Sequence, residues 1–173
     1  IGLTLDATGI PKTADDRLAI ARRILDAALS CGIRKEDVYI DCLTLTVSAQ
    51  QDQAVETLEA VRRVKTELGL KTTLGVSNIS FGLPARPLMN QTFLTMAMGA
   101  GLDLPILNPN DRAMMDAVSA ARVLQGTKAD LDRYVEKHSG QTAPAAPAAK
   151  ESRSLSELVE KGLKQEARAV TRT

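Results

Sequence analysis

Four short apolar stretches, each followed by a turn and then by a stretch of helical periodicity, constrain the fold of this chain more than any other feature. The apolar stretches are rich in β-branched and aliphatic residues and lie at residues 1–5, 38–43, 72–76 and 104–107. Strands that alternate with helices in this way are typical of βαβ units, whose strands run parallel in one sheet. The pattern therefore predicts an α/β fold.

The spacing of the predicted strands narrows the fold class. Successive strands start at residues 1, 38, 72 and 104, which gives repeats of 37, 34 and 32 residues. A (β/α)8 TIM barrel of ~250 residues has about 31 residues in each βα unit. We therefore interpret the chain as about four βα units, or half of a barrel. It begins at Ile1, directly in a predicted strand and without an initiator Met, so we expect an upstream portion.

Capping residues place the helices between the strands. Thr13 is the predicted N-cap of the first helix, and glycines end the first and second helices at Gly32 and Gly69. A third helix is expected over about residues 87–100, and Asn110 is the predicted cap of a fourth. The apolar periodicity predicts that the inward-facing residues are Leu18, Ala21, Leu25, Ala28, Leu29, Val55, Leu58, Val61, Val64, Leu68, Leu88, Met89, Phe93, Leu94, Met96, Ala97, Met114, Ala117, Val118, Ala121 and Leu124.

Composition and charge argue against several classes of protein. The 173 residues include 22 basic and 21 acidic ones, which are interspersed along the chain and leave a net charge of +1. The sequence has no stripe of basic residues accompanied by stacking aromatic residues, which is the pattern that would indicate a nucleic-acid-binding surface. No apolar run approaches the ~20 residues that span a bilayer. We expect a cytoplasmic protein with no nucleic-acid or membrane partner.

The two cysteines do not have the spacing of a metal site. Cys31 and Cys42 are not part of a CxxC motif, and no cluster of histidines accompanies them. We expect both to be small buried hydrophobic residues, and we predict neither a zinc site nor a disulfide.

The composition changes after residue 138. Residues 139–153 are rich in Gly, Pro and Ala and have no hydrophobic period, which predicts a linker between residues 1–138 and the last part of the chain. The sequence Ser154-Leu155-Ser156-Glu157 has the pattern of a capping box, and an apolar stripe follows it. Residues 154–173 therefore predict an amphipathic helix that belongs to a different domain.

Polar side chains at the ends of two predicted strands are the first candidates for a functional site. Asp41 follows the apolar residues 38–40, and Asn78 follows the strand at residues 72–76, just before a Gly/Pro loop. The carboxyl ends of barrel strands carry the catalytic groups of TIM-barrel enzymes. From the residues alone, a simple turn or cap is the better explanation for Asp41 and an equally good one for Asn78, since Asp and Asn are common in turns.

Three neighbouring runs resemble the pterin-binding domain of corrinoid-dependent methyltransferases. They are YIDCL at residues 39–43, GVSNISFGLPAR at 75–86 and RPLMNQTF at 86–93, and the resemblance covers roughly residues 1–125. The family includes the folate module of cobalamin-dependent methionine synthase and methyltetrahydrofolate:corrinoid iron–sulfur protein methyltransferase. The resemblance implies a complete TIM barrel, of which this chain would be the last four βα units, with the N-terminal half-barrel missing. The helix at residues 154–173 also resembles the start of the helical cap over cobalamin in methionine synthase.

The resemblance implies roles for the residues at the strand ends. In the similar enzymes the residue matching Asp41 hydrogen-bonds the pterin ring, and the one matching Asn78 contacts N5 of methyltetrahydrofolate, the atom that loses the methyl group. An amide there would stabilise the charge that develops as the methyl group leaves. Further substrate-binding candidates are Gly75 and Ser77, which flank Asn78, Arg86, which would support the loop, and in a second tier Asp6 and Asn108 at the outer strand ends.

Three functions are compatible with these patterns. The first is transfer of the N5 methyl group of methyltetrahydrofolate to the cobalt of a corrinoid or cobalamin on a partner domain or protein, with no metal bound by this chain itself. The second is dihydropteroate synthase, but enzymes of that type carry Ser-Arg-Lys-Ser-Phe where this chain has SNISF at residues 77–81. The third is a non-catalytic binding fragment, which would have to dimerise or find a complementary segment to cover its sheet. The sequence does not distinguish methionine synthase from a stand-alone methyltransferase.

Overall fold

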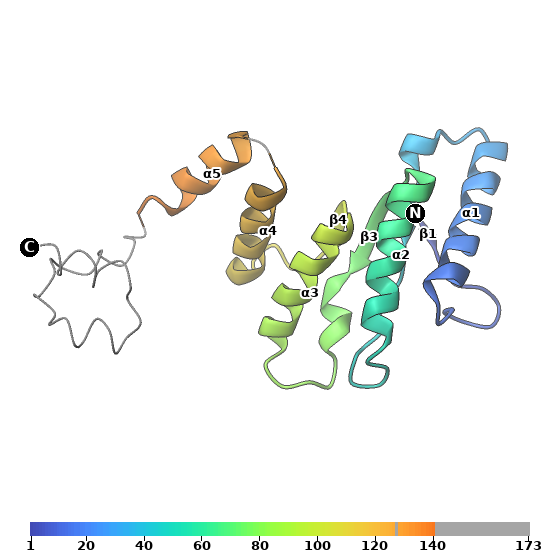
Figure 1. The fold of residues 1–173 in the computed structure, drawn as a ribbon, viewed down its shortest axis with the longest axis horizontal. Helices are drawn as coiled ribbons and strands as arrows, with labels where there is room; N and C mark the ends of the chain where they lie inside the picture. Colours follow the sequence, from blue (N-terminus) through green and yellow to red (C-terminus); the bar gives the residue numbers. More distant parts are fainter. Residues whose placement is uncertain (127, 141–173) are drawn as a thin grey trace, which may run out of the picture. The chain divides into compact units, whose positions relative to one another are not determined.

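The computed structural model describes residues 1–126 and 128–140, and these form four parallel strands that alternate with helices (Figure 1). The predicted fold class is confirmed, because the four βα units follow one another in the order expected for part of a TIM barrel. The chain divides into a unit Ile1–Val135 and a unit Glu136–Thr173, and the fold described below is that of the first unit. Beyond residue 140, the predicted linker and the helix predicted at residues 154–173 lie outside the described residues.

The sheet is short and regular. Its strands are β1 (Gly2–Leu3), β2 (Tyr39–Asp41), β3 (Lys71–Gly75) and β4 (Leu104–Ile106), and they neighbour one another in chain order. The register places Leu3 opposite Asp41, Asp41 opposite Thr73, and Thr73 opposite Leu104. Strands β1, β2 and β4 are shorter than the predicted stretches, and β3 has the predicted length but starts one residue earlier.

The helices begin and end largely where their capping residues predict. Thr13 accepts a hydrogen bond from the Asp16 backbone N–H as N-cap of α1, and Gly69 ends α2 in the left-handed conformation with φ 60°. The helices are α1 (Ala14–Ser30), η1 (Lys35–Asp37), α2 (Gln53–Leu68), η2 (Val76–Ser80), α3 (Arg86–Ala100), α4 (Arg112–Gln125) and α5 (Lys128–His138).

The core lies between one face of the sheet and the helices. Ile40 of β2 and Leu74 of β3 are fully buried, and they belong to one cluster with Val61 of α2 and Leu94 of α3. Because successive strand residues point to opposite faces, the neighbours Asp41 and Gly75 face the other side of the sheet. The helices therefore cover one face only, and the strand-end residues of interest project from the opposite one.

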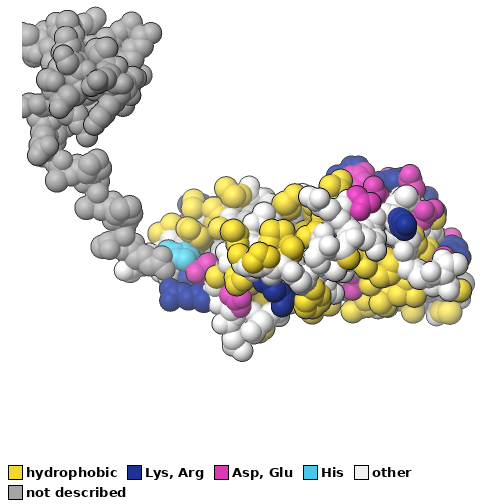
Figure 2. Space-filling model, turned by 90° about the horizontal axis from the view of Figure 1, so that it is seen from below, with side chains coloured by type: hydrophobic (Ala, Val, Ile, Leu, Met, Phe, Trp, Pro, Cys, Tyr) yellow, Lys and Arg dark blue, Asp and Glu magenta, His cyan; other side chains and the backbone are white. Residues whose placement is uncertain are grey.

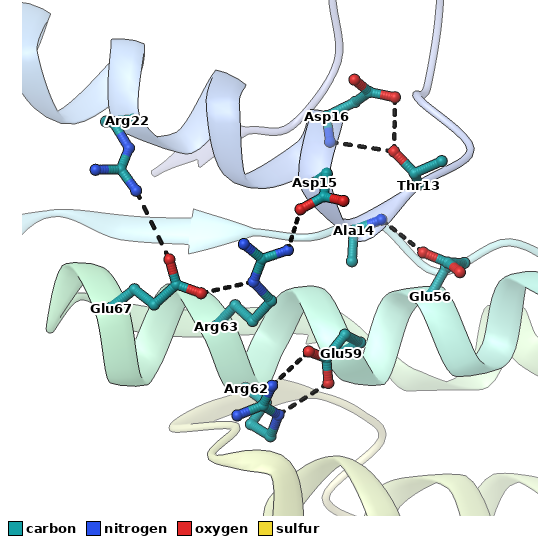
Figure 3. Close-up of polar contacts among 10 residues, drawn as sticks. All are labelled: Thr13, Ala14, Asp15, Asp16, Arg22, Glu56, Glu59, Arg62, Arg63 and Glu67. Carbon is teal, nitrogen blue, oxygen red and sulfur yellow. Dashed lines mark hydrogen bonds and ion pairs between the residues drawn. The ribbon is translucent and has the colours of Figure 1, made fainter.

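Charged side chains join α1 to α2 on the outer surface (Figure 3). Arg63 of α2 bonds to Asp15 of α1 and to Glu67, and Glu67 also lies 3.7 Å from Arg22 of α1. Such exposed pairs stabilise a protein weakly. They orient the two helices against each other, whereas the apolar core supplies the stabilisation.

Several predicted inward-facing residues are exposed instead. In α2 the side chains buried near the helix start are the polar Gln53 and Thr57, because both hydrogen-bond to the buried Arg17 of α1. Val55 lies on the outer side of the same turn. The predicted inward positions that are exposed are Leu29, Val55, Leu88, Met96 and Leu124.

Two further predictions from the sequence are wrong. The N-cap of α4 is Asp111 rather than Asn110, since the Asp111 carboxylate accepts the Met114 backbone N–H at 3.2 Å. Cys31 is exposed at the end of α1, whereas Cys42 is buried as predicted.

The second face of the sheet has no helices over it among the described residues. Leu3, Leu104 and Ile106 share the register of Asp41 and Gly75, and they are 47%, 48% and 57% exposed. Figure 2, which views the molecule from below Figure 1, shows hydrophobic side chains exposed on the surface seen from that side. In a complete barrel this face would form the interior.

None of the described helices is long and apolar enough to span a membrane.

Candidate functional site

The predicted site residues gather at one edge of the sheet. Asp41 is the last residue of β2 and Gly75 the last of β3, while Asp6 and Asn108 follow β1 and β4. Since the four strands are parallel, these residues all lie at the carboxyl edge. This is the edge on which barrel enzymes carry their catalytic loops.

Asp41 is a half-buried carboxyl group with one local hydrogen bond. Its Oδ1 accepts the backbone N–H of Leu43 at 2.8 Å, and its carbonyl accepts the backbone N–H of Thr4 at 3.0 Å. Burial raises the pKa of Asp41, and the hydrogen bond from Leu43 opposes this shift. The two oxygens of a carboxylate accept several hydrogen bonds, so Asp41 retains capacity for the N–H groups of a ligand.

Asn78 lies in η2, directly beyond the end of β3, and its side chain is exposed. The amide folds back toward Gly75: a Cβ atom at position 75 would lie 3.3 Å from Asn78 Nδ2. Gly75 has φ −75°, which any residue adopts, so a substitution at this position would act through its side chain and not through the backbone conformation. Gly75 leaves room for the Asn78 amide over the end of the strand.

Arg86 fixes the conformation of η2 from the start of α3. Its Nε donates to Ser80 Oγ at 3.0 Å, and Nη2 donates to the carbonyl of Ser77 at 3.3 Å. The guanidinium carbon also lies 4.6 Å from the centre of the Phe81 ring. These contacts agree with the loop-supporting role that the resemblance implies for Arg86, and they assign Ser77 a contribution through its backbone carbonyl.

Ser80 and Asn90 complete this network, although the sequence analysis did not select them. Ser80 is fully buried, and its Oγ donates to Asn90 Oδ1 at 2.7 Å. Asn90 lies four residues after Arg86, one turn further along α3. That spacing places both side chains on the helix face that contacts η2. The same spacing is the feature of the sequence that could have identified Asn90.

The loop after β2 is tied to the loop after β3. Thr46 and Ser48 both donate to the carbonyl of Phe81 at 2.7 Å, and the Val47 backbone N–H donates to the carbonyl of Ile79 at 3.1 Å. The segments that carry Asp41 and Asn78 are therefore held together by hydrogen bonds. Nothing local in the sequence indicates this connection.

Two residues without glycine's freedom adopt a left-handed backbone next to these loops. Leu43 has φ 60° two residues after Asp41, and Ala85 has φ 51° immediately before Arg86. Such a conformation is unfavourable for a side chain with Cβ, and it persists where surrounding contacts hold it. Both positions redirect the chain just beyond a candidate site residue.

Asp6 and Asn108 are engaged in local turns. Asp6 Oδ1 accepts the backbone N–H of Thr8 at 2.8 Å and its hydroxyl at 2.6 Å, and these bonds lower the pKa of Asp6. Asn108 Oδ1 accepts the Asn110 backbone N–H at 3.0 Å. The turns account for both residues, so a role in ligand binding stays a prediction.

Metal ligands do not cluster in this region. Within residues 1–126 and 128–140, no group of three or more His, Cys, Asp or Glu side chains is placed to hold a metal ion. The chemistry available from the residues at the sheet edge is hydrogen bonding by a carboxylate and an amide that are held by tied loops.

Comparison with known proteins gives a family match over most of this region. Residues 8–108 match the model of a family described as pterin binding enzyme. The chain is 32% identical over 142 residues to a methylcorrinoid:tetrahydrofolate methyltransferase of Eubacterium limosum, which covers 80% of this chain and 50% of that protein.

Two methionine synthases are also similar. The identity is 37% over 116 residues for that of Mycobacterium leprae strain TN, covering 62% of this chain and 10% of the synthase. It is 36% over 126 residues for that of Mycobacterium tuberculosis strain ATCC 25618 / H37Rv, covering 68% of this chain and 11% of the synthase. The chain thus spans half or less of the length of each of these relatives.

Proposed function

The chain belongs to the pterin binding enzyme family, and we propose that it supplies the part of a corrinoid-dependent methyltransferase that contacts methyltetrahydrofolate. One observation carries the proposal. The carboxyl edge of the sheet presents the Asp41 carboxyl group at the end of β2 and the Asn78 amide just beyond the end of the neighbouring β3, and the loops after these strands are hydrogen-bonded to each other. The names of the three relatives, which refer to methylcorrinoid, tetrahydrofolate or methionine, support the choice of substrate.

Asp41 is the proposed anchor for the pterin ring. The 2-amino-4-oxo pterin has N–H donors along one edge, and a carboxylate accepts two of them side by side. The hydrogen bond from the Leu43 N–H to Asp41 holds one carboxylate oxygen in place before the ligand arrives. Burial raises the pKa of Asp41 in the free protein, and two N–H donors would favour its ionised form in the complex.

Asn78 is the proposed partner of N5. In the transfer, the bond between N5 and the methyl carbon breaks, and its electron pair stays on nitrogen. A hydrogen bond from the Asn78 amide would stabilise the negative charge that develops on N5. An amide does not titrate, so Asn78 orients and polarises, and the proton that N5 finally gains comes from another donor. The corrinoid supplies the cobalt that accepts the methyl group, and we place it on a partner domain or protein.

Transfer in the opposite direction is the second candidate. The name of the Eubacterium limosum relative places methylcorrinoid first and tetrahydrofolate second. The same groups would serve both directions, because forward and reverse transfer share one transition state. Product analysis from both starting mixtures distinguishes which direction the protein favours.

The open sheet face is the reason to propose that further βα units pack against this chain. Leu3, Leu104 and Ile106 expose apolar surface on the side opposite the helices. We propose that strands of an N-terminal half-barrel close the sheet and cover this face. Size-exclusion chromatography of the isolated chain tests the alternative, in which a second copy covers the face as a homodimer.

The experiment that tests the function is a rapid-mixing assay of the full-length protein with cob(I)alamin and methyltetrahydrofolate. We expect demethylation of the folate and a slower rate in Asn78→Ala. Condensation of a pterin pyrophosphate with p-aminobenzoate, measured in parallel, covers the dihydropteroate synthase alternative. Full-length protein that binds no folate and transfers no methyl group in either direction would overturn the proposal.

A further inference from the structure

A guanidinium group is fully buried next to the segment that carries Asp41. Arg17 lies in the first turns of α1 and has no exposed surface. Among the described residues it donates five hydrogen bonds. A buried charge is expensive unless its donors are all satisfied, so the surroundings of Arg17 have to keep their geometry.

The acceptors of Arg17 belong to three separate segments. Nε donates to the carbonyl of Pro11 at 2.9 Å, in the loop after β1, and Nη2 donates to Gln53 Oε1 at 2.7 Å. Nη1 donates to Thr57 Oγ1 at 2.8 Å. The same Nη1 donates to the carbonyls of Cys42 and Leu43, at 3.1 and 3.3 Å. None of these acceptors is a carboxylate, so the contacts fix backbone and side-chain positions rather than neutralise charge.

Leu43 is the strained residue of this group. Its φ of 60° is unfavourable for a residue with Cβ, and its carbonyl is held by Arg17 and, at 3.2 Å, by the hydroxyl of Thr57. Its backbone N–H donates to Asp41 Oδ1 at 2.8 Å. The peptide groups on both sides of Leu43 are therefore engaged, one by Asp41 and the other by Arg17 and Thr57.

We propose that Arg17 is a positioning residue for Asp41: it holds Leu43 in the left-handed conformation that aims the Leu43 N–H at the Asp41 carboxylate. Arg17 contacts no ligand in this role and acts through Leu43. The proposal rests on the proposed folate site only for its binding readout, because the orientation of Asp41 is measurable in the free protein.

The test compares variants of the full-length protein. Arg17→Gln removes the guanidinium that donates to the carbonyls of Cys42 and Leu43, together with its positive charge. Thr57→Val removes the hydroxyl that donates to the Leu43 carbonyl and leaves the charge unchanged. Arg22→Gln is the matched control, since Arg22 is an exposed arginine of the same helix that pairs with Glu67. The two readouts are the dissociation constant for methyltetrahydrofolate and the pKa of Asp41 from a carboxyl ¹³C titration without ligand.

For Arg17→Gln we expect affinity to fall by about tenfold and the pKa of Asp41 to rise by about one unit, as expected for loss of a hydrogen bond to the charged form. Thr57→Val should shift both in the same direction but less, and Arg22→Gln should change neither. Leu43→Gly, added to either variant, should restore part of both losses, because glycine adopts φ 60° without strain.

A purely structural role for Arg17 gives a different pattern. The proposal is wrong if folded Arg17→Gln and Thr57→Val lose thermal stability while the pKa of Asp41 and the folate affinity stay at the wild-type values. If Arg17→Gln does not fold, Thr57→Val with and without Leu43→Gly decides. If the wild-type protein binds no folate, the proposed function fails, but the titration of Asp41 still decides the role of Arg17.

Discussion

At the residue scale, the burial of the proposed site residue Asp41 affects stability. Burial raises its pKa above the unfolded value, so the folded state favours the protonated form. The stability associated with Asp41 is therefore fully present below the unfolded pKa and is lost as pH rises through the folded pKa. At neutral pH the buried carboxylate destabilises the fold relative to its protonated form. In the proposed function, the same carboxylate would offer a pterin two acceptor oxygens.

Replacement of Asp41 should separate these two effects. Asp41→Asn should weaken folate binding by about 1–3 kcal/mol, because a charge-assisted hydrogen bond is lost. The same variant should unfold at a higher temperature than wild type at about pH 7, and the difference should shrink toward about pH 4 as the wild-type carboxylate takes up a proton. Calorimetric titration and thermal unfolding of the full-length protein measure the two quantities. Unchanged folate affinity would remove Asp41 from the site.

Gly75 provides a test of the position of Asn78 without changing the amide itself. In Gly75→Ala the new Cβ would meet Asn78 Nδ2 at 3.3 Å, so the amide has to shift, while the backbone conformation suits alanine. We expect the methyl-transfer rate to fall, as in Asn78→Ala, with little change in thermal stability. For both variants the rate with cob(I)alamin should fall more than folate affinity, because the proposed contact at N5 would strengthen as charge develops. A loss of affinity alone would make Asn78 a binding residue only.

At the scale of elements, a local capping residue determines where α4 starts, whereas a tertiary contact joins the start of α3 to η2. α4 starts at Arg112 because the Asp111 side chain accepts the Met114 N–H, whereas Asn110 donates its own backbone N–H to the preceding Asn108 turn. Two adjacent Asx residues thus have different tasks, one closing a turn and the next starting a helix. Helix α3 has no side-chain cap and is joined to η2 through Arg86 instead.

Capping of α4 can be tested with a pair of neighbouring variants. Asp111→Ala should lower the free energy of unfolding by about 1 kcal/mol, the usual effect of losing an N-cap acceptor. Asn110→Ala is the matched control and should have a much smaller effect, since the backbone rather than the side chain of Asn110 makes the turn contact. Urea denaturation of the same protein background compares the two. An equal loss in both variants would contradict the assignment of the cap.

At the scale of the whole molecule, the sheet is covered on one side only. The helices α1 to α4 bury Ile40 and Leu74, while Leu3, Leu104 and Ile106 are exposed on the opposite face. In a barrel, side chains of all the strands fill this space in layers. On the proposed half-barrel arrangement, the residues at the carboxyl edge would form one wall of a site whose remaining walls belong to other strands.

The isolated 173-residue chain should bind methyltetrahydrofolate weakly or not at all. In the proposed site, Asp41 and Asn78 would contact only one side of the pterin, and the open sheet face should bind a hydrophobic dye such as ANS. Titration calorimetry and dye fluorescence of the isolated chain, with the full-length protein as control, measure both effects. A micromolar folate complex of the isolated monomer would contradict the half-barrel interpretation.

The sequence by itself determined the alternation of strands and helices, the caps at Thr13 and Gly69, and the location of Asp41 and Asn78 near strand ends. These features depend on residues within a few positions of one another. Side-chain periodicity, capping hydrogen bonds and turn preferences act over that range, so a single chain records them. The resemblance added the pterin-binding domain, which the family match bears out.

Only the tertiary structure decided which polar residues hydrogen-bond to the segments that carry the candidate site residues. Arg17 and Cys42 are 25 positions apart, and Thr46 and Phe81 are 35 apart, yet each pair is joined by a hydrogen bond. The same kind of contact buries Gln53 and Thr57 in place of Val55, because Arg17 requires acceptors on that side of α2. Such pairings form when strands and helices pack, and no local pattern specifies the distant partner.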